Sequence, residues 1–86
     1  MRVLMQQPPQ AQESPRYVSI SLQQDLLGGW VLLRESGLIG GKSQLKREQY
    51  LETELAIEAF EKARAVHLKK GFQVMFVQGA PEPKQP

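Results

Sequence analysis

Basic side chains and glycines gather in the middle of this sequence, in a pattern that suits contact with phosphate groups. The basic residues are Arg34, Lys42, Lys46 and Arg47, and the segment Ser36 to Ser43 (SGLIGGKS) among them holds three glycines. Cationic side chains can follow a phosphate backbone, and a glycine-rich loop can present backbone N–H groups to an anion as a nest. This segment and its flanks are the candidate site.

The same features also have purely structural explanations. Gly37, Gly40 and Gly41 suit a turn that needs positive φ angles. The basic residues suit solvated charge or the protection of an edge strand, and Glu35 and Glu48 lie among them and weaken the patch. Both explanations stay open at this stage.

Other residues are weaker candidates. Lys69 and Lys70 precede Gly71 at the end of an expected helix, where lysines usually complement the negative helix terminus. Trp30 is a candidate stacking platform, but its place at the start of an apolar strand favours packing. His67 falls on the apolar arc of the expected helix, which favours a packed, neutral histidine over a ligand.

No pattern in the sequence couples a nucleophile to a base. The chain has no cysteine and one histidine, so a zinc site lacks ligands. The Lys42-Ser43 pair follows glycines but lacks the strand-loop-helix spacing of a phosphate-binding loop. The carboxylates gather around the expected helix, at Glu48, Glu52, Glu54, Glu58 and Glu61. We therefore expect no enzyme, no metal and no cofactor.

Length and composition set the outer limits. With 86 residues and a net charge of +2, the chain fits one domain whose charge neither demands nor excludes an anionic partner. The opening residues are too polar for a secretory signal, and no run approaches the length of a membrane span. We expect a cytoplasmic protein with no membrane partner, and the oligomeric state stays open.

The elements that must position these residues follow from hydrophobic periodicity. Alternating or apolar runs predict four strands, at Tyr17 to Gln24, Trp30 to Glu35, Gln44 to Tyr50 and Phe72 to Val77. Turns are expected at Asp25 to Gly29 and, as a longer loop, at Ser36 to Ser43.

One amphipathic helix is expected from Glu54 to Lys70, with Thr53 as the N-cap and Gly71 in the left-handed position after the end. Its expected buried arc consists of Leu55, Ala56, Ala59, Phe60, Ala63 and Val66. The compact solution is an α+β fold in which an antiparallel sheet of about four strands packs against this helix, in the order β-β-β-α-β.

Proline- and glutamine-rich segments lie outside these elements. We interpret residues 1–15 as a flexible leader, residues 16–78 as the domain, and residues 79–86 as a disordered tail.

From Tyr17 to Val77 the chain resembles a WGR domain. The resemblance rests on YVSISLQQD, GGWVLLR, SGLIGGKSQ, LAIEAFEKARAVHLKKGF and the closing VMF. WGR domains combine an antiparallel sheet with one helix. They occur in DNA-dependent poly(ADP-ribose) polymerases, where they grip a DNA break, and in small bacterial proteins. The resemblance therefore implies a β-β-β-α-β fold and contact with DNA.

The signature that names the family is changed in this chain. Aligned on Gly37 and Gly40, Ser36 stands at the Trp position and Leu38 at the Arg position, and Gln44 matches a later Gln. An aromatic ring stacks on a nucleotide and an arginine binds phosphate, and neither Ser36 nor Leu38 does so.

Two hypotheses from different classes follow. The first is a non-enzymatic module that binds DNA or another nucleic acid weakly. Its candidate site residues are Arg34, Ser36, Gly37, Leu38, Gly40, Lys42, Gln44, Lys46, Arg47, Lys69 and Lys70. The second is a protein-interaction or regulatory module that has lost DNA contact, with Leu38 and Ile39 as an apolar tip that contacts a separately encoded protein.

Overall fold

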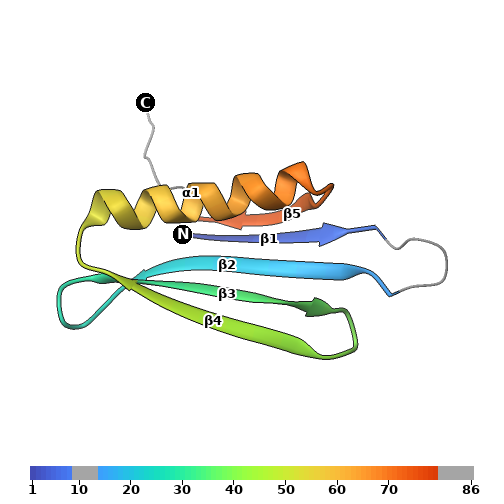
Figure 1. Cartoon of the computed structure of the whole chain (residues 1–86), viewed down its shortest axis with the longest axis horizontal. Coiled ribbons are helices and arrows are strands. Elements are labelled where there is room, and N and C mark those ends of the chain that lie inside the picture. Colours follow the sequence, from blue (N-terminus) through green and yellow to red (C-terminus); the bar gives the residue numbers. More distant parts are fainter. Residues whose placement is uncertain (9–13, 80–86) are drawn as a thin grey trace.

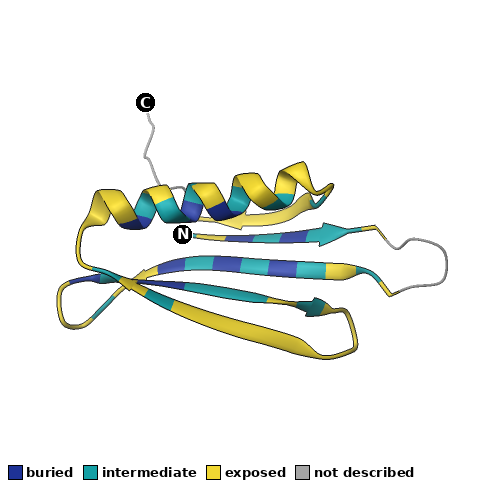
Figure 2. Cartoon of the chain, in the orientation of Figure 1, coloured by how far each residue is buried: buried dark blue, intermediate teal, exposed yellow. Residues whose placement is uncertain are grey.

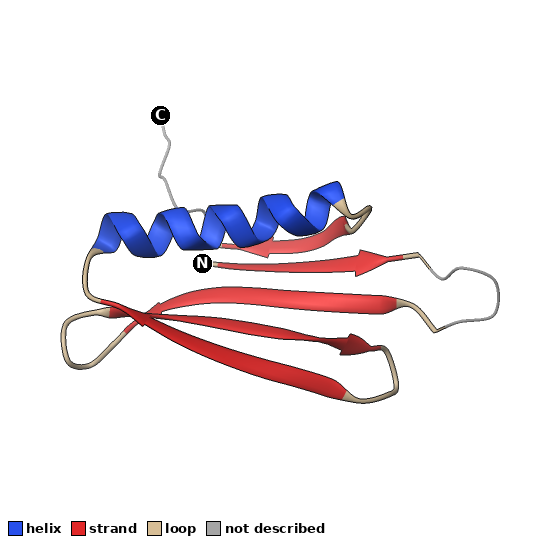
Figure 3. Cartoon of the chain, in the orientation of Figure 1, coloured by secondary structure: helices blue, strands red, loops and turns tan. Residues whose placement is uncertain are grey.

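The computed structural model describes residues 1–8 and 14–79, which form one antiparallel sheet and one helix (Figures 1 and 3). The elements are β1 (Arg2–Gln7), β2 (Arg16–Gln24), β3 (Trp30–Leu38), β4 (Ser43–Tyr50), α1 (Thr53–Lys69) and β5 (Gln73–Gln78). In space the strands follow the order β4-β3-β2-β1-β5. The expected α+β class, with one sheet against one helix, is confirmed.

The interpretation of residues 1–15 as a flexible leader is wrong for Arg2–Gln7. These residues form β1, which pairs with β2 on one side and β5 on the other, so the domain begins before residue 16. Val3 and Met5 are fully buried in the core. Residues 9–13 of the expected leader and 80–86 of the expected tail lie outside the described residues.

The helix covers one face of the sheet, and the core lies between them (Figure 2). Val18, Ile20 and Leu22 of β2 are buried, as their alternation predicts. The helix contributes only Ala56, Phe60 and Ala63 as buried residues. The outer positions of the expected arc, Leu55 and Val66, are about half exposed. A narrow stripe suffices because small alanines let the helix lie close to the strands.

Both ends of the helix are defined by backbone contacts. The expected N-cap role of Thr53 is wrong, because Thr53 is already helical and Glu52 is the cap residue, with no side-chain capping bond. The expected C-terminal stop at Gly71 is confirmed by its φ of 94°. The amides of Gly71 and Phe72 donate to the carbonyls of Leu68 and His67, which is the hydrogen-bond pattern of a Schellman motif.

Half of the segment from Ser36 to Ser43 is strand, so the expected loop is too long at both ends. Strand β3 continues to Leu38, and Gly37 pairs with Tyr17 and Ser43. A Cβ at position 37 would clash with the carbonyl oxygen of Lys42, so glycine is needed for a close backbone approach. Only Gly40, with a φ of 80°, supplies the positive angle that the tight turn requires.

The length and polarity of a helix determine whether it could cross a membrane. In the part of the chain that the structure describes, no helix combines the length and the apolar character needed to cross a bilayer.

Candidate functional site

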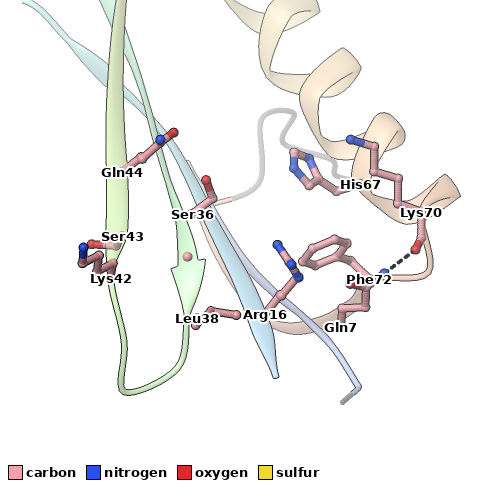
Figure 4. A pocket seen from close by; sticks show the side chains of 11 residues that line it. Gln7, Arg16, Ser36, Leu38, Lys42, Ser43, Gln44, His67, Lys70 and Phe72 are labelled. Carbon is pink, nitrogen blue, oxygen red and sulfur yellow. Dashed lines mark hydrogen bonds between the residues drawn. The ribbon is translucent and has the colours of Figure 1, made fainter. Parts of the chain in front are cut away.

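A cleft of about 680 Å³ opens at one end of the sheet, between the C-terminus of α1 and the β3–β4 hairpin. Figure 4 shows its walls, with His67 and Lys70 on the helix side and Ser43 and Gln44 on the hairpin side. The floor comes from the adjoining ends of β1 and β2. Four separate parts of the chain therefore meet in this cleft.

Six residues of the sequence-based site line the cleft, namely Ser36, Gly37, Leu38, Lys42, Gln44 and Lys70. They come together because β3 and β4 pair in register, with Ser36 opposite Gln44. The β3–β4 hairpin, which carries the changed family signature, thus forms one wall of the cleft.

The cleft is also lined by five residues that the sequence analysis did not name as site residues, namely Gln7, Arg16, Ser43, His67 and Phe72. Arg16 begins β2 opposite Leu38 of β3. Alternation along β2 places Arg16 on the same face as Val18, which was the available signal, but the predicted strand began only at Tyr17. The addition of Arg16 gives the cleft a cation from the floor as well as from the walls.

The charge of the cleft is one-sided. Arg16, Lys42 and Lys70 line it, and none of the described residues that line it is a carboxylate. Within residues 1–8 and 14–79, none of these three cations forms an ion pair with a carboxylate. The cleft therefore concentrates positive charge that no carboxylate in the described part of the chain offsets within its lining.

Several carbonyl groups at the helix end beside the cleft already accept hydrogen bonds within the protein. The Gln7 side-chain amide donates to the Lys70 carbonyl oxygen at 2.7 Å, a bond drawn in Figure 4. The carbonyls of His67 and Leu68 accept the bonds of the Schellman motif. The negative end of the helix is thereby partly neutralised by N–H donors and by the charge of Lys70.

An aromatic pair forms part of the helix-side wall. The His67 Nδ1 atom lies 2.9 Å from the Ala63 carbonyl oxygen, so it donates a hydrogen bond and leaves Nε2 as the second polar atom of the ring. The His67 and Phe72 rings meet edge to face with centroids 5.1 Å apart. The prediction that His67 packs against the domain is confirmed, although its ring also faces the cleft.

Arg34 and Arg47 do not join the cleft. Arg34 Nη2 lies 3.1 Å from a carboxylate oxygen of Glu48, so this cation is already paired. Arg47 is opposite Leu33 on the face away from the helix. The sequence-based patch of four basic residues is therefore wrong as a single surface, because strand alternation separates Arg47 and an ion pair occupies Arg34.

Lys46 and Lys69 lie outside the cleft lining. Lys46 is exposed and opposite Arg34, on the helix-facing side of β4. Lys69 is exposed at the last position of α1. Both can add to the field around the cleft without contacting a ligand inside it.

The anion nest expected from the backbone between Gly37 and Gly41 is not supported by the hydrogen bonding. The Leu38 amide donates to the Lys42 carbonyl, the Ile39 amide donates to Pro15, and the Gly41 amide donates to Leu38. Because these three N–H groups are already satisfied within the protein, we expect side chains to carry the main contact with an anion.

A small polar network links β3 and β4 outside the cleft lining. The Tyr50 hydroxyl donates to Glu48, which also pairs with Arg34. Burial raises the pKa of the Tyr50 phenol above its ordinary value of 10.0, and the negative charge of Glu48 raises this pKa further. The Trp30 indole is half-buried against the core and donates to the Thr53 hydroxyl, so its packing role is confirmed.

Comparisons of the chain with protein-family models, with curated proteins and with solved structures found no match. The WGR resemblance therefore stays a hypothesis that rests on the residues quoted above.

Proposed function

We propose that this domain is a non-enzymatic module that binds nucleic acid, with a backbone phosphate held in the cleft beside α1. The observation that carries the proposal is the convergence of Arg16, Lys42 and Lys70 in a cleft that no described carboxylate lines. Charge-assisted hydrogen bonds from arginine and lysine are the usual contacts to phosphate oxygens. The resemblance to a family that grips DNA breaks points to the same ligand.

The surroundings of the cleft suit a polymer better than a single small anion. Lys46 and Lys69 lie outside the lining and extend the positive field along β4 and α1. The rings of His67 and Phe72 offer a surface against which an unpaired base can pack. Because the cations are solvent-accessible, each contact is weak, and several along one backbone are needed for measurable affinity.

A cytoplasmic location is part of the same proposal. Nucleic acid is accessible there, and a chain without cysteine needs no oxidising compartment to fold.

The test compares two variants of equal charge by fluorescence anisotropy with labelled nicked, blunt and single-stranded DNA. Arg16→Gln with Lys70→Gln removes two cations from the cleft, whereas Arg2→Gln with Arg47→Gln removes two from the opposite face of the sheet. We expect the first pair to weaken binding at least about tenfold and the second to change it much less. Equal losses would show that the cleft is not the binding site.

Salt dependence provides the second readout. If about three phosphates are contacted, the logarithm of the duplex association constant falls with the logarithm of salt concentration at a slope near −3. The cleft variant should reduce the steepness of that slope by roughly two. A flat salt response of the unmodified chain would exclude phosphate contact.

A second candidate function rests on the hairpin turn. Leu38 and Ile39 are 37% and 41% exposed at the tip of the β3–β4 hairpin, where they form a small apolar surface. This surface suits contact with a protein. A pull-down that depends on Leu38, tested with Leu38→Ser, and that nuclease treatment does not change would favour this function over nucleic-acid binding.

A further inference from the structure

The two outer strands of the sheet differ sharply in how they meet solvent. Strand β4 carries Lys46, Arg47 and Glu48 along its length, and charges of this kind discourage pairing with another chain. Strand β5 (QVMFVQ) has no charge and no proline, and every one of its residues is exposed (Figure 2). Its four apolar side chains, Val74, Met75, Phe76 and Val77, are 42–56% exposed. An apolar outer strand without these protections is a template for another strand.

The sequence of β5 indicates which strand would fit. It has the same pattern in both directions, with a Gln at each end, a Val inside each Gln, and Met75 and Phe76 in the middle. Antiparallel pairing of two copies about an axis between Met75 and Phe76 would place Gln73 opposite Gln78 and Val74 opposite Val77 of the other copy. Every cross-strand pair would then join like with like.

The faces of the side chains agree with this register only because β5 is irregular. Residues three apart on a regular strand point to opposite faces, and such residues cannot face each other across a two-fold axis perpendicular to the sheet. In β5, however, Val77 is opposite Val3 and Val74 is opposite Met5, and both partners are buried under the helix. A register shift at Leu4/Met5 therefore turns both valines to the helix side.

The two glutamines of β5 obey the same symmetry. Gln73 is opposite Gln6 and Gln78 is opposite Arg2, so both glutamines point to the face away from the helix. Phe76 is opposite Leu4 on that same face. Bulges often protect outer strands, but this one gives the valines and the glutamines of the two halves of β5 matching faces.

We propose that two copies of this chain associate through antiparallel pairing of their β5 strands, with Val74 of each opposite Val77 of the other. The two sheets then form one continuous sheet with both helices on the same face. The uncharged strand adds no repulsion, and pairing covers four apolar side chains on each copy. This inference does not depend on nucleic-acid binding, because β5 lies outside the cleft lining.

Sedimentation equilibrium of the full chain tests the association. We expect a reversible dimer over a roughly hundredfold range of concentration, and the variant Phe76→Lys should raise its dissociation constant at least about tenfold. The control is Leu45→Lys, which adds the same charge to an exposed apolar position on the opposite outer strand, β4. A monomeric unmodified chain, or equal effects of the two lysines, would overturn the proposal.

Disulfide trapping tests the register without disturbing the core. Because the chain has no cysteine, the double variant Gln73→Cys with Gln78→Cys has only these two thiols. Directly opposite residues in an antiparallel pair lie within disulfide reach, whereas the two positions within one copy are too far apart along the strand. We expect a covalent dimer from the double variant and little from either single variant. Efficient crosslinking by a single cysteine would show a different register and contradict the proposal.

Discussion

Arg16 and Arg34 show how neighbouring side chains decide what a cation is able to bind. Both are on the helix-facing side of the sheet, but Glu48 pairs with Arg34, whereas Arg16 lines a cleft without a carboxylate among its described residues. Composition and spacing did not indicate that Glu48 would pair with Arg34 and that Arg16 would line the cleft. The same reasoning separates Lys42, which lines the cleft, from Arg47 on the opposite face.

The changed signature positions offer a gain-of-function prediction. Ser36 and Leu38 are exposed and line the cleft, so Ser36→Trp with Leu38→Arg would add a stacking ring and a phosphate-binding group there. Because stacking contributes about 1–3 kcal/mol per base, anisotropy should show DNA binding strengthened at least about fivefold. The control, Gln23→Trp with Leu45→Arg on the other face, should change binding much less. No gain over this control would contradict the role assigned to the cleft.

A single methyl group at Gly37 tests the close approach of the hairpin strands. Gly37→Ala would place a Cβ against the backbone of Lys42, so we expect a loss of about 1–3 kcal/mol in the free energy of unfolding, measured with urea. A Cβ at position 41 would have its closest contact with the side chain of Leu38, 3.2 Å away. Gly41→Ala should cost less, and an equal or larger loss at Gly41 would refute this explanation.

At the scale of elements, periodicity predicted the strands with clear alternation and failed where that signal was short or mixed with glycine. Val18, Ile20 and Leu22 identified β2 correctly. Strand β1 was missed because Val3 and Met5 give only two buried positions next to a polar, proline-containing segment. Strand β3 was ended too early because Gly37 was interpreted as a turn residue, whereas it allows two backbones to approach.

Strand β1 makes a direct contribution to stability. Met5 is fully buried, so Met5→Ala should lower the free energy of unfolding by about 2–5 kcal/mol. The neighbouring Gln6 points to the other face, and Gln6→Ala should have a much smaller effect. Urea denaturation of both variants distinguishes an integral strand from a leader, for which both losses would be near zero.

The network at the β3–β4 pair predicts a dependence of stability on alkaline pH. The pKa of Tyr50 is raised in the folded chain, chiefly by burial and then by Glu48, so the unfolded chain loses this proton first. The stabilisation is therefore complete below the unfolded pKa and is lost as the pH rises through the folded pKa. Unfolding measured from about pH 9 to about pH 11 should show a steeper loss for the unmodified chain than for Tyr50→Phe. Equal slopes would contradict the raised pKa.

At the scale of the whole molecule, charged residues among those described differ between the two ends of the long axis, which extends 44 Å. Arg16, Lys42 and Lys70 lie at the end where the helix finishes, whereas Glu52 and Glu54 lie where it begins (Figure 1). A net charge of +2 conceals this division. The opposite ends should therefore differ in their attraction for a polyanion.

The cleft itself was only partly predictable from the sequence. The residues near the changed signature were identified because they are contiguous, from Ser36 to Gln44. Gln7, His67 and Phe72 come from segments far away in the chain, and only the folding of α1 over the sheet brings them to the hairpin. No local periodicity carries that information.

The most direct test of nucleic-acid binding by the cleft is an amide chemical-shift map of the isotope-labelled full chain, titrated with a short nicked duplex at low salt. We predict that the shifts concentrate at Arg16, Ser36, Lys42 and Lys70, and that added salt reverses them. Shifts confined to the opposite face of the sheet, around Leu33, or no shifts at any ratio of DNA to protein, would contradict the account.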